Sequence, residues 1–388
     1  MAIIGIIAEF NPLHAGHKRL IDSVKQPDNT IICALSGNFV QRGDVSILSK
    51  QKRAEQALKC GVDIVSEIPV LWSMSTAQNF ALAGVWQLYN LNCEKIVFGS
   101  ECGDIQKLLT AADILLSDDF SSLVCESIKS GITFAAARQQ AAEALGIDST
   151  LLSSPNDNLG IEYIIAAKKL NLPMKFDCIK RMGASHDSNC ADTSFVSSSF
   201  LRQKILDGNI GYAERFMPIL LRGMINEENT ADIARIEKAI LGILRLKSQD
   251  ELKNLPDISE GIENKLYFSI RVASSLEELS SMIKTKRYTL ARVRRLILSA
   301  ALGFDNEFFM TTPPYTRLLG FSKHGESVLK NIASITPVVT KASQIKQLEN
   351  EAANKVFAAE SRATDLYNLS FKTPRECGEE FKAKLLKY

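Results

Sequence analysis

The stretch Ile3-Ile4-Gly5-Ile6-Ile7-Ala8-Glu9-Phe10-Asn11-Pro12-Leu13-His14-Ala15-Gly16-His17-Lys18-Arg19-Leu20 begins with an apolar run and ends in a segment of helical character. The run over 3–8 predicts a buried parallel strand, and Asn11-Pro12 marks a turn after it. Ligands bind at this strand-to-helix edge in open α/β sheets. The free N–H groups and the dipole of the helix start favour a phosphate there, and Gly16, which has no Cβ, permits close approach of the backbone.

Strand and helix signals continue to alternate through the first half of the chain. Apolar runs at 30–35, 62–65 and 95–98 predict strands, and 49–59 and 75–91 predict helices between them. This order indicates an α/β fold with a parallel, Rossmann-like sheet. From 104 to about 170 the signals are helical, so we expect a helical insertion before a last strand at 173–180.

Beyond about residue 212 the alternation stops. Helical periodicity is present at 233–246, 262–273, 275–284 and 290–302. With 388 residues the chain is long enough for two domains. We therefore predict a catalytic α/β domain over 1–215, with its insertion at about 104–170, and a mostly α-helical C-terminal domain over 216–388.

The composition excludes several classes of protein. Hydrophobic residues make up 46% of the chain and charged residues 23%, as in globular proteins, and the net charge of +2 limits any nucleic-acid surface to a local patch. The apolar runs are far shorter than the ~20 residues of a membrane span. Eight cysteines without a CxxC pair predict reduced thiols in a cytoplasmic protein, with neither a structural metal nor a membrane partner. The oligomeric state cannot be inferred.

The histidines of the first stretch, His14 and His17, are the first candidates for chemistry. They could be ordinary surface residues, or a zinc pair that lacks a third ligand. In the reading that we favour, two donor imidazoles bridge the phosphate oxygens of ATP and stabilise charge at the α-phosphorus. A P-loop and a GxGxxG after a strand are both absent, so the chain is neither a kinase-type NTPase nor a nicotinamide dehydrogenase.

A second phosphate cradle is predicted at Val196-Ser197-Ser198-Ser199-Phe200-Leu201-Arg202. Alone it is weak, because serine-rich helix starts are common caps. Together with the HxGH stretch it resembles a nucleotidyltransferase superfamily pattern of HxGH plus ISSTxIR, with Ser199 where Thr is usual and Leu201 where Ile is usual. This resemblance makes His14, His17 and Arg202 the candidate catalytic residues.

Further matches narrow the resemblance to one family. GIIAEFNPLHAGH (5–17), SGNFVQRG (36–43), EIP (67–69), FGSE (98–101), KRMGASHD (180–187) and KRYT (286–289) together resemble the bacterial tRNA(Met) cytidine acetate ligase family over nearly the whole chain. The resemblance implies that ATP and acetate give acetyl-adenylate and pyrophosphate. The acetyl group then passes to N4 of the wobble cytidine of elongator tRNA(Met).

The same resemblance, with the serine cradle, implies the nucleotide contacts. The residues concerned are Ile7, Ala8, Glu9, Phe10, Asn11, Pro12, Leu13, His14, Ala15, Gly16, His17, Lys18, Arg19, Leu20, Gly99, Asn158, Arg181, Ser197, Ser198 and Ser199. Within the stretch 156–158 we favour Asn158 over Asn156. Mg²⁺ is expected with ATP, held mainly by the phosphates and by a carboxylate such as Glu9.

Two further groups of residues complete the expected sites. Ser36, Asn38, Gln41 and Arg42 follow the second strand and are candidates for the acetate or base pocket, although a plain polar loop explains them as well. The stretch 281–300 has six basic residues and no acid, which predicts a tRNA-binding face with Tyr315 and Arg317 as weaker additions. Its candidates are Lys284, Lys286, Arg287, Tyr288, Arg292 and Arg295. A solvated basic helix is the alternative.

Two other functions stay open at this point. The chain could be a small-molecule adenylyltransferase that joins AMP to a phosphorylated metabolite, or a non-catalytic RNA-binding protein. The basic helical half argues against the first of these, and the intact His14, His17 and Arg202 argue against the second.

Overall fold

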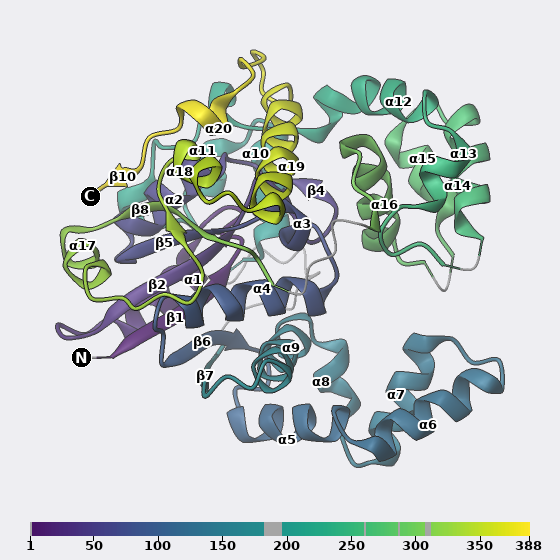
Figure 1. Cartoon of the computed structure of the whole chain (residues 1–388), viewed down its shortest axis with the longest axis horizontal. Coiled ribbons are helices and arrows are strands. Elements are labelled where there is room, and N and C mark those ends of the chain that lie inside the picture. Colours follow the sequence, from purple (N-terminus) through teal and green to yellow (C-terminus); the bar gives the residue numbers. More distant parts are fainter. Residues whose placement is uncertain (1, 182–195, 260, 286–287, 307–311) are drawn as a thin grey trace.

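A computed structural model describes residues 2–181, 196–259, 261–285, 288–306 and 312–388 (Figure 1). Within them, eight strands form one sheet in the order β10-β8-β5-β2-β1-β6-β7, and β9 pairs with β8. The strands are β1 (Ile3–Ala8), β2 (Thr30–Ser36), β5 (Ile64–Ile68), β6 (Lys95–Ser100), β7 (Lys175–Lys180), β8 (Thr316–Phe321), β9 (Val338–Val339) and β10 (Leu386–Lys387). A separate hairpin joins β3 (Phe39–Val40) to β4 (Asp44–Val45).

The expected parallel sheet is confirmed, with the opening strand at its centre. β1 pairs in parallel with β2 and β6, β2 with β5, and β6 with β7. Helices cover both faces, so alternate side chains of β1 enter different cores. Ile4 and Ile6 pack with α1 (Ala15–Val24), α2 (Lys50–Lys59) and α10 (Ser198–Leu206).

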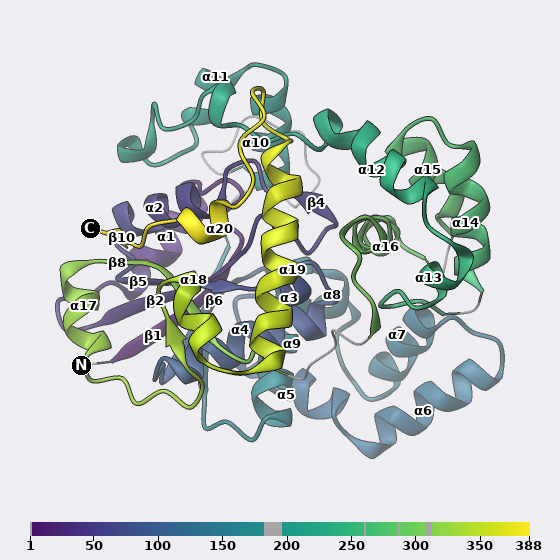
Figure 2. The ribbon, with the colours of Figure 1, turned by 45° about the horizontal axis from the view of Figure 1, so that its top comes forward.

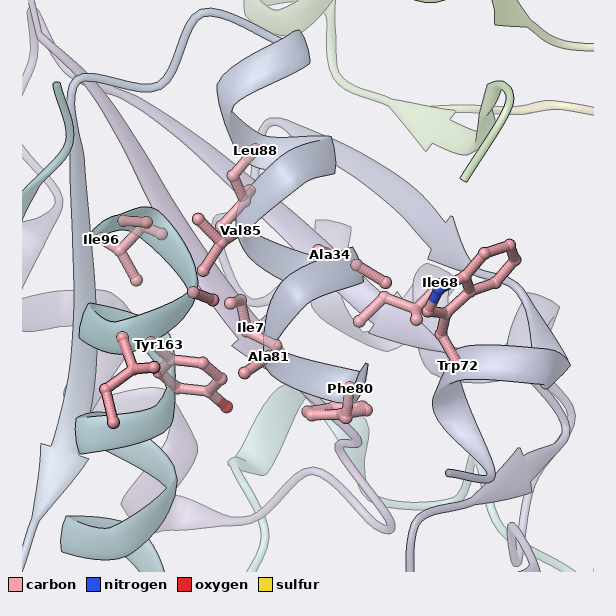
Figure 3. Packing of buried hydrophobic residues seen from close by; sticks show 14 of the residues in the cluster. Ile7, Ala34, Ile68, Trp72, Phe80, Ala81, Val85, Leu88, Ile96 and Tyr163 are labelled. Carbon is pink, nitrogen blue, oxygen red and sulfur yellow. The ribbon is translucent and has the colours of Figure 1, made fainter. Parts of the chain in front are cut away.

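The other face of β1 packs against α4 (Ala77–Asn90) and α9 (Pro155–Lys169), with α3 (Val70–Ser73) beside them. Figure 3 shows Ile7 among Ala81, Val85 and Tyr163 in this core. Because both faces are covered, the polar residues that follow β1 and β6 can meet at the carboxyl ends of the strands.

The helical insertion predicted for 104–170 is also confirmed. It comprises α5 (Ile105–Leu115), α6 (Asp118–Lys129), α7 (Phe134–Ala144), α8 (Ser149–Ser153) and α9. Helix α5 packs on α9 and β7, and α6 and α7 lie farther from the sheet at the lower right of Figure 1. Helix α9 returns to the sheet and lies against α4 and β6.

The helical periodicity predicted a separate core in the C-terminal half, and only part of that half forms one. After α11 (Ile210–Glu214) and three 3₁₀ turns, η1 (Ile219–Leu221), η2 (Glu227–Asn229) and η3 (Ile233–Ile236), five helices pack together: α12 (Glu237–Arg245), α13 (Gln249–Lys253), α14 (Ile262–Val272), α15 (Leu276–Ile283) and α16 (Leu290–Leu302). We call α12–α16 the helical module. Figure 2 shows it beside the sheet-containing body.

The last 73 residues from Thr316 do not belong to the helical module, which corrects the expectation of one helical domain over 216–388. Strand β8 adds antiparallel to β5, and β9 and β10 extend the sheet. The connecting helices are α17 (Lys323–Leu329), α18 (Ala342–Gln347), α19 (Glu351–Asn368) and α20 (Glu379–Lys382). Strand β8 was not predicted from the sequence, because its Arg317 is a charged residue that is buried. None of the helices in the described ranges is long and apolar enough to cross a membrane.

Candidate active site

A cavity of about 240 Å³ lies where β1 and β6 end and α1 and α10 begin. Most of the residues predicted from the sequence line it, although His14 and His17 are far from Arg202 along the chain. The predicted residues on its wall are Ile7, Ala8, Glu9, Phe10, Asn11, His14, Gly16, His17, Arg19, Leu20, Gln41, Arg42, Gly99, Arg181, Ser198, Ser199 and Arg202. Pro12, Leu13, Ala15, Lys18 and Ser197 lie outside that wall.

The two imidazoles are fixed by the start of α1. His14 is the N-cap, and its Nδ1 accepts a hydrogen bond from the N–H of Gly16 at 3.0 Å. The N–H of His14 in turn donates to Nδ1 of His17 at 3.4 Å. The rings are stacked with centroids 3.9 Å apart. This reciprocal capping box explains why the histidines are three residues apart.

The hydrogen bonds also set the protonation of these rings. Burial lowers the pKa of His17 well below its ordinary value, and His14 and Arg181 lower it further, so His17 is neutral near pH 7. In both rings Nδ1 accepts a backbone N–H, which places the proton of the neutral ring on Nε2. His17 therefore offers an N–H donor at Nε2 without adding a positive charge.

The predicted serine cradle lies opposite this pair at the start of α10. Ser197 is the N-cap and accepts from the N–H of Phe200 at 3.2 Å, and Ser198 and Ser199 line the cavity. Arg202, one turn into the helix, donates to the carbonyl oxygen of Asn11 at 2.8 Å. The guanidinium therefore supports the β1–α1 loop as well as adding positive charge to the cavity.

Arg53 is a second support of this loop, and the sequence analysis did not single it out. It is fully buried on α2 and donates to the carbonyl oxygens of Glu9 at 2.6 Å, Leu48 at 3.0 Å and Gly37, and to the hydroxyl of Ser36 at 3.2 Å. Burial lowers its pKa to about 10. A basic residue in an amphipathic helix gives no sign of such a role, because most of them face solvent.

The start of α9 brings Asn156 to the cavity in place of the expected Asn158. Asn156 lines the cavity, accepts from Nη1 of Arg181 at 3.4 Å and donates to Glu101 at 2.5 Å. Asn158 is not on the wall, and its Oδ1 is buried without a hydrogen-bond partner. Asn156 and Asn158 are the second and fourth residues of α9 and face different directions, which the sequence stretch alone could not resolve.

Of the four candidates for the acetate or base pocket, two line the cavity and two do not. Gln41 and Arg42, on the β3–β4 hairpin, line the cavity, and the N–H of Gln41 donates to Oε1 of Glu9 at 3.1 Å. Ser36 and Asn38 are buried in structural roles instead. Ser36 accepts from Arg53, and Asn38 accepts from the N–H of Lys50 at 2.8 Å and donates to Thr364 at 3.1 Å.

Several candidates for a tRNA-binding face are engaged within the protein. Tyr288, a predicted tRNA contact, is only 5% exposed and bonds Ser259. Arg292 pairs with Asp257 at 3.1 Å and lies over the ring of Tyr288. Arg295 donates to the carbonyl oxygen of Gln41 at 3.1 Å.

The outcome differs among the remaining tRNA-binding candidates. Lys286 and Arg287 lie outside the described residues. Tyr315 and Arg317 are buried, so they are not surface contacts. Lys284, at the C-cap of α15, is exposed.

A family model described as HIGH Nucleotidyl Transferase matches residues 1–381. The tRNA(Met) cytidine acetate ligase of Caldanaerobacter subterraneus subsp. tengcongensis is 38% identical over 389 residues, covering 96% of both chains. That of Thermoanaerobacter sp. strain X514 is 35% identical over 402 residues, covering 100% of both.

Two solved structures of Thermotoga maritima TmcAL cover 100% of both chains at 29% identity. The one bound with alpha-thio ATP superposes with a TM-score of 0.90, and the apo form with 0.93.

Proposed function

The chain belongs to the tRNA(Met) cytidine acetate ligase family of HIGH nucleotidyl transferases, and we propose that it uses ATP to join acetate to a cytidine of tRNA(Met). The observation that carries the proposal is the cavity whose wall holds both the stacked imidazoles of His14 and His17 and the serine cradle of α10. A related structure that holds alpha-thio ATP supports ATP as the nucleotide.

The first step of the proposal is adenylation of acetate. An acetate oxygen attacks the α-phosphorus of ATP, and the bond from that phosphorus to the bridging oxygen of pyrophosphate breaks. The Nε2–H groups of His14 and His17 donate to phosphate oxygens as charge builds up on them. The serine hydroxyls and the N–H groups at the start of α10 hold other phosphate oxygens. Catalysis here is positioning and electrostatics, and no covalent intermediate with the protein is needed.

The second step is acetyl transfer. The exocyclic amine of cytosine attacks the carbonyl carbon of acetyl-adenylate, the carbon–oxygen bond to AMP breaks, and the amine loses one proton. Mg²⁺ would accompany the triphosphate. Among the described residues that line the cavity, Glu9 supplies the one carboxylate, which suits a cation held mainly by phosphates.

Acetate-dependent ATP–pyrophosphate exchange tests the first step. We expect exchange that requires acetate, and its loss in His17→Asn. His324→Asn is the matched control, because His324 is exposed and lies against Thr30, away from the cavity. Exchange that needs a phosphorylated metabolite would instead favour a small-molecule adenylyltransferase. Absence of exchange in every mixture would favour a non-catalytic RNA-binding protein.

We also propose that the helical module contacts the tRNA through the basic stretch that begins at Lys284. Joint replacement of Lys284, Lys286 and Arg287 by Ala should weaken tRNA binding and leave acetate-dependent exchange unchanged. Lys238 and Lys253, basic residues on α12 and α13, serve as the matched control pair. Equal loss of exchange would contradict this assignment. A cytoplasmic location stays a prediction.

A further inference from the structure

A second cavity, of about 180 Å³, lies between the sheet-containing body and the helical module. Trp72 and Asn79 line it from α3 and α4, and Arg295 and Ser299 line it from α16. Asp257, on the loop before α14, is a further part of its wall. The proposed adenylation chemistry makes no use of this cavity.

The two cavities are neighbours. Asn79 lines the second cavity, and the next residue of α4, Phe80, lines the first. On the other side, Arg295 lines the second cavity and donates to the carbonyl oxygen of Gln41, whose own N–H donates to Glu9 in the first cavity. A group held in the second cavity therefore lies next to the place where acetyl-adenylate is proposed to form.

The size of this cavity suits a single six-membered ring. A protein cavity of ~150 Å³ takes up benzene, and this cavity is slightly larger. Its wall combines the indole of Trp72 and the apolar side chains of Met74 and Leu296 with polar groups that can meet the edge of a base. An aromatic ring beside polar donors and acceptors is how proteins hold a base taken out of a single-stranded loop.

The polar groups have the right types for a pyrimidine. Arg295 is a donor that can meet the ring nitrogen and the carbonyl oxygen of cytosine, and Ser299 and Asn79 can donate or accept. Asp257 pairs with Arg292 and lies 3.6 Å from Arg295, so its carboxylate holds the guanidinium of Arg295 in place. Burial lowers the pKa of Arg295, and Asp257 opposes this effect.

From this juxtaposition we propose that the cavity between α3–α4 and α16 receives the acceptor pyrimidine of the RNA. The base enters as a single unstacked ring, with its exocyclic amine toward the Gln41 side and the first cavity. A purine, with its second ring, is excluded by size. This inference rests on the proposed function, since it places the acceptor of the second step.

Filling the cavity separates this proposal from the proposed function. Ser299 is 4% exposed and lines the cavity, so Ser299→Phe should fill it and Ser299→Ala should leave it open. We expect Ser299→Phe to keep acetate-dependent exchange and tRNA binding but to slow acetyl transfer at least ~100-fold, as expected for a displaced acceptor. Ser299→Ala should retain all three. Equal transfer by the two variants, or equal loss of exchange and transfer, overturns the proposal.

A crosslinking measurement on the unmodified protein guards against a variant that fails to fold. Full-length tRNA(Met) with 4-thiouridine at the modified position is irradiated in complex with the enzyme, and the crosslinked peptide is sequenced. We expect the crosslink within 71–79 or 295–305, the segments that contribute most of this wall. A crosslink confined to other segments overturns the cavity assignment. Absence of acetate-dependent exchange in the wild-type enzyme would defeat the proposed function itself.

Discussion

Replacement of Lys50 by Met should destabilise the protein strongly. The Lys50 ammonium is fully buried and lies 2.9 Å from Glu360, 2.5 Å from Glu380 and in contact with Glu67. Arg317 completes this buried cluster through Glu380 and, at 3.6 Å, Glu67. In the part of the chain that the structure describes, the three glutamates form the one group spaced to hold a metal ion. The ammonium lies among them, so the lysine takes the place that a cation would have.

The size of the loss follows from the charges that remain. Removal of one partner from a buried ion pair costs about 3–5 kcal/mol, because the other charge stays buried without compensation. For a chain of 388 residues that corresponds to a melting temperature lower by about 4–6 °C, at roughly 1.2 °C per kcal/mol.

The loss should also depend on pH. Burial and Glu360 raise the pKa of Glu67 well above its ordinary value, although Lys50 opposes them. Burial also raises the pKa of Glu380, but Lys50 and Arg317 lower it below the ordinary value. Without Lys50 the pKa values of both carboxyl groups rise in the folded state. At a pH between the ordinary carboxyl pKa and these raised values, the folded protein holds protons that the unfolded chain has released. Stability of this kind is present at low pH and is lost as pH rises.

Urea unfolding followed by circular dichroism at pH 5 and pH 8 measures both effects. We expect the deficit of Lys50→Met to be larger at pH 8. Lys52→Met is the control on the same helix, since Lys52 makes a half-exposed pair with Glu55, and its change should stay within about 0.5 kcal/mol. A Lys50→Met protein as stable as the control, or a deficit that is larger at pH 5, would refute the account of this cluster.

Three further predictions concern the active cavity and its supports. Gly43 has φ +71°, and a Cβ there would lie 2.6 Å from the backbone of α16, so Gly43→Ala should lower both the melting temperature and acetyl transfer. Gly208→Ala, at φ +80° in open space, controls for backbone strain, and an equal effect of the two would refute the contact. A Cβ at Gly16 would lie 2.9 Å from Cε1 of His14, so Gly16→Ala should slow exchange while the melting temperature stays unchanged, and an unchanged exchange rate would contradict this. Because the pKa of His17 is held well below its ordinary value by burial, exchange should show no titration of His17 between pH 8 and pH 6; a step there that His17→Asn removes would disprove it.

The sequence predicted the elements whose signals are local. The strands of the parallel sheet and the helical insertion depend on periodicity, and the structure confirms them. Strand β8 could not be predicted in this way. Its Arg317 is satisfied by Glu67 and Glu380, which are 250 residues before it and 63 residues after it in the chain, so no window of sequence contains the reason for its burial.

The parts of the candidate site that depend on local sequence were also predictable. The spacing of His14 and His17 reflects one capping box, and the serine cradle reflects one helix start. The roles of Arg53 and Ser36 depend instead on which carbonyl and hydroxyl groups the folded chain brings to one buried guanidinium. Polar residues that look like pocket candidates in the sequence were therefore used to hold the pocket's loops.

The β3–β4 hairpin is the element that connects ATP chemistry with the helical module. One end of it contacts the nucleotide cavity, where the N–H of Gln41 bonds Glu9, and the other, at Gly43, packs against the backbone of α16. Arg295 of α16 fixes the hairpin by bonding the carbonyl oxygen of Gln41. A shift of α16 on binding RNA must therefore move Gln41 or break this bond, because close packing at Gly43 leaves no room for the two elements to slide. The same short hairpin thus sets the distance between the adenylation cavity and the cavity proposed for the acceptor base.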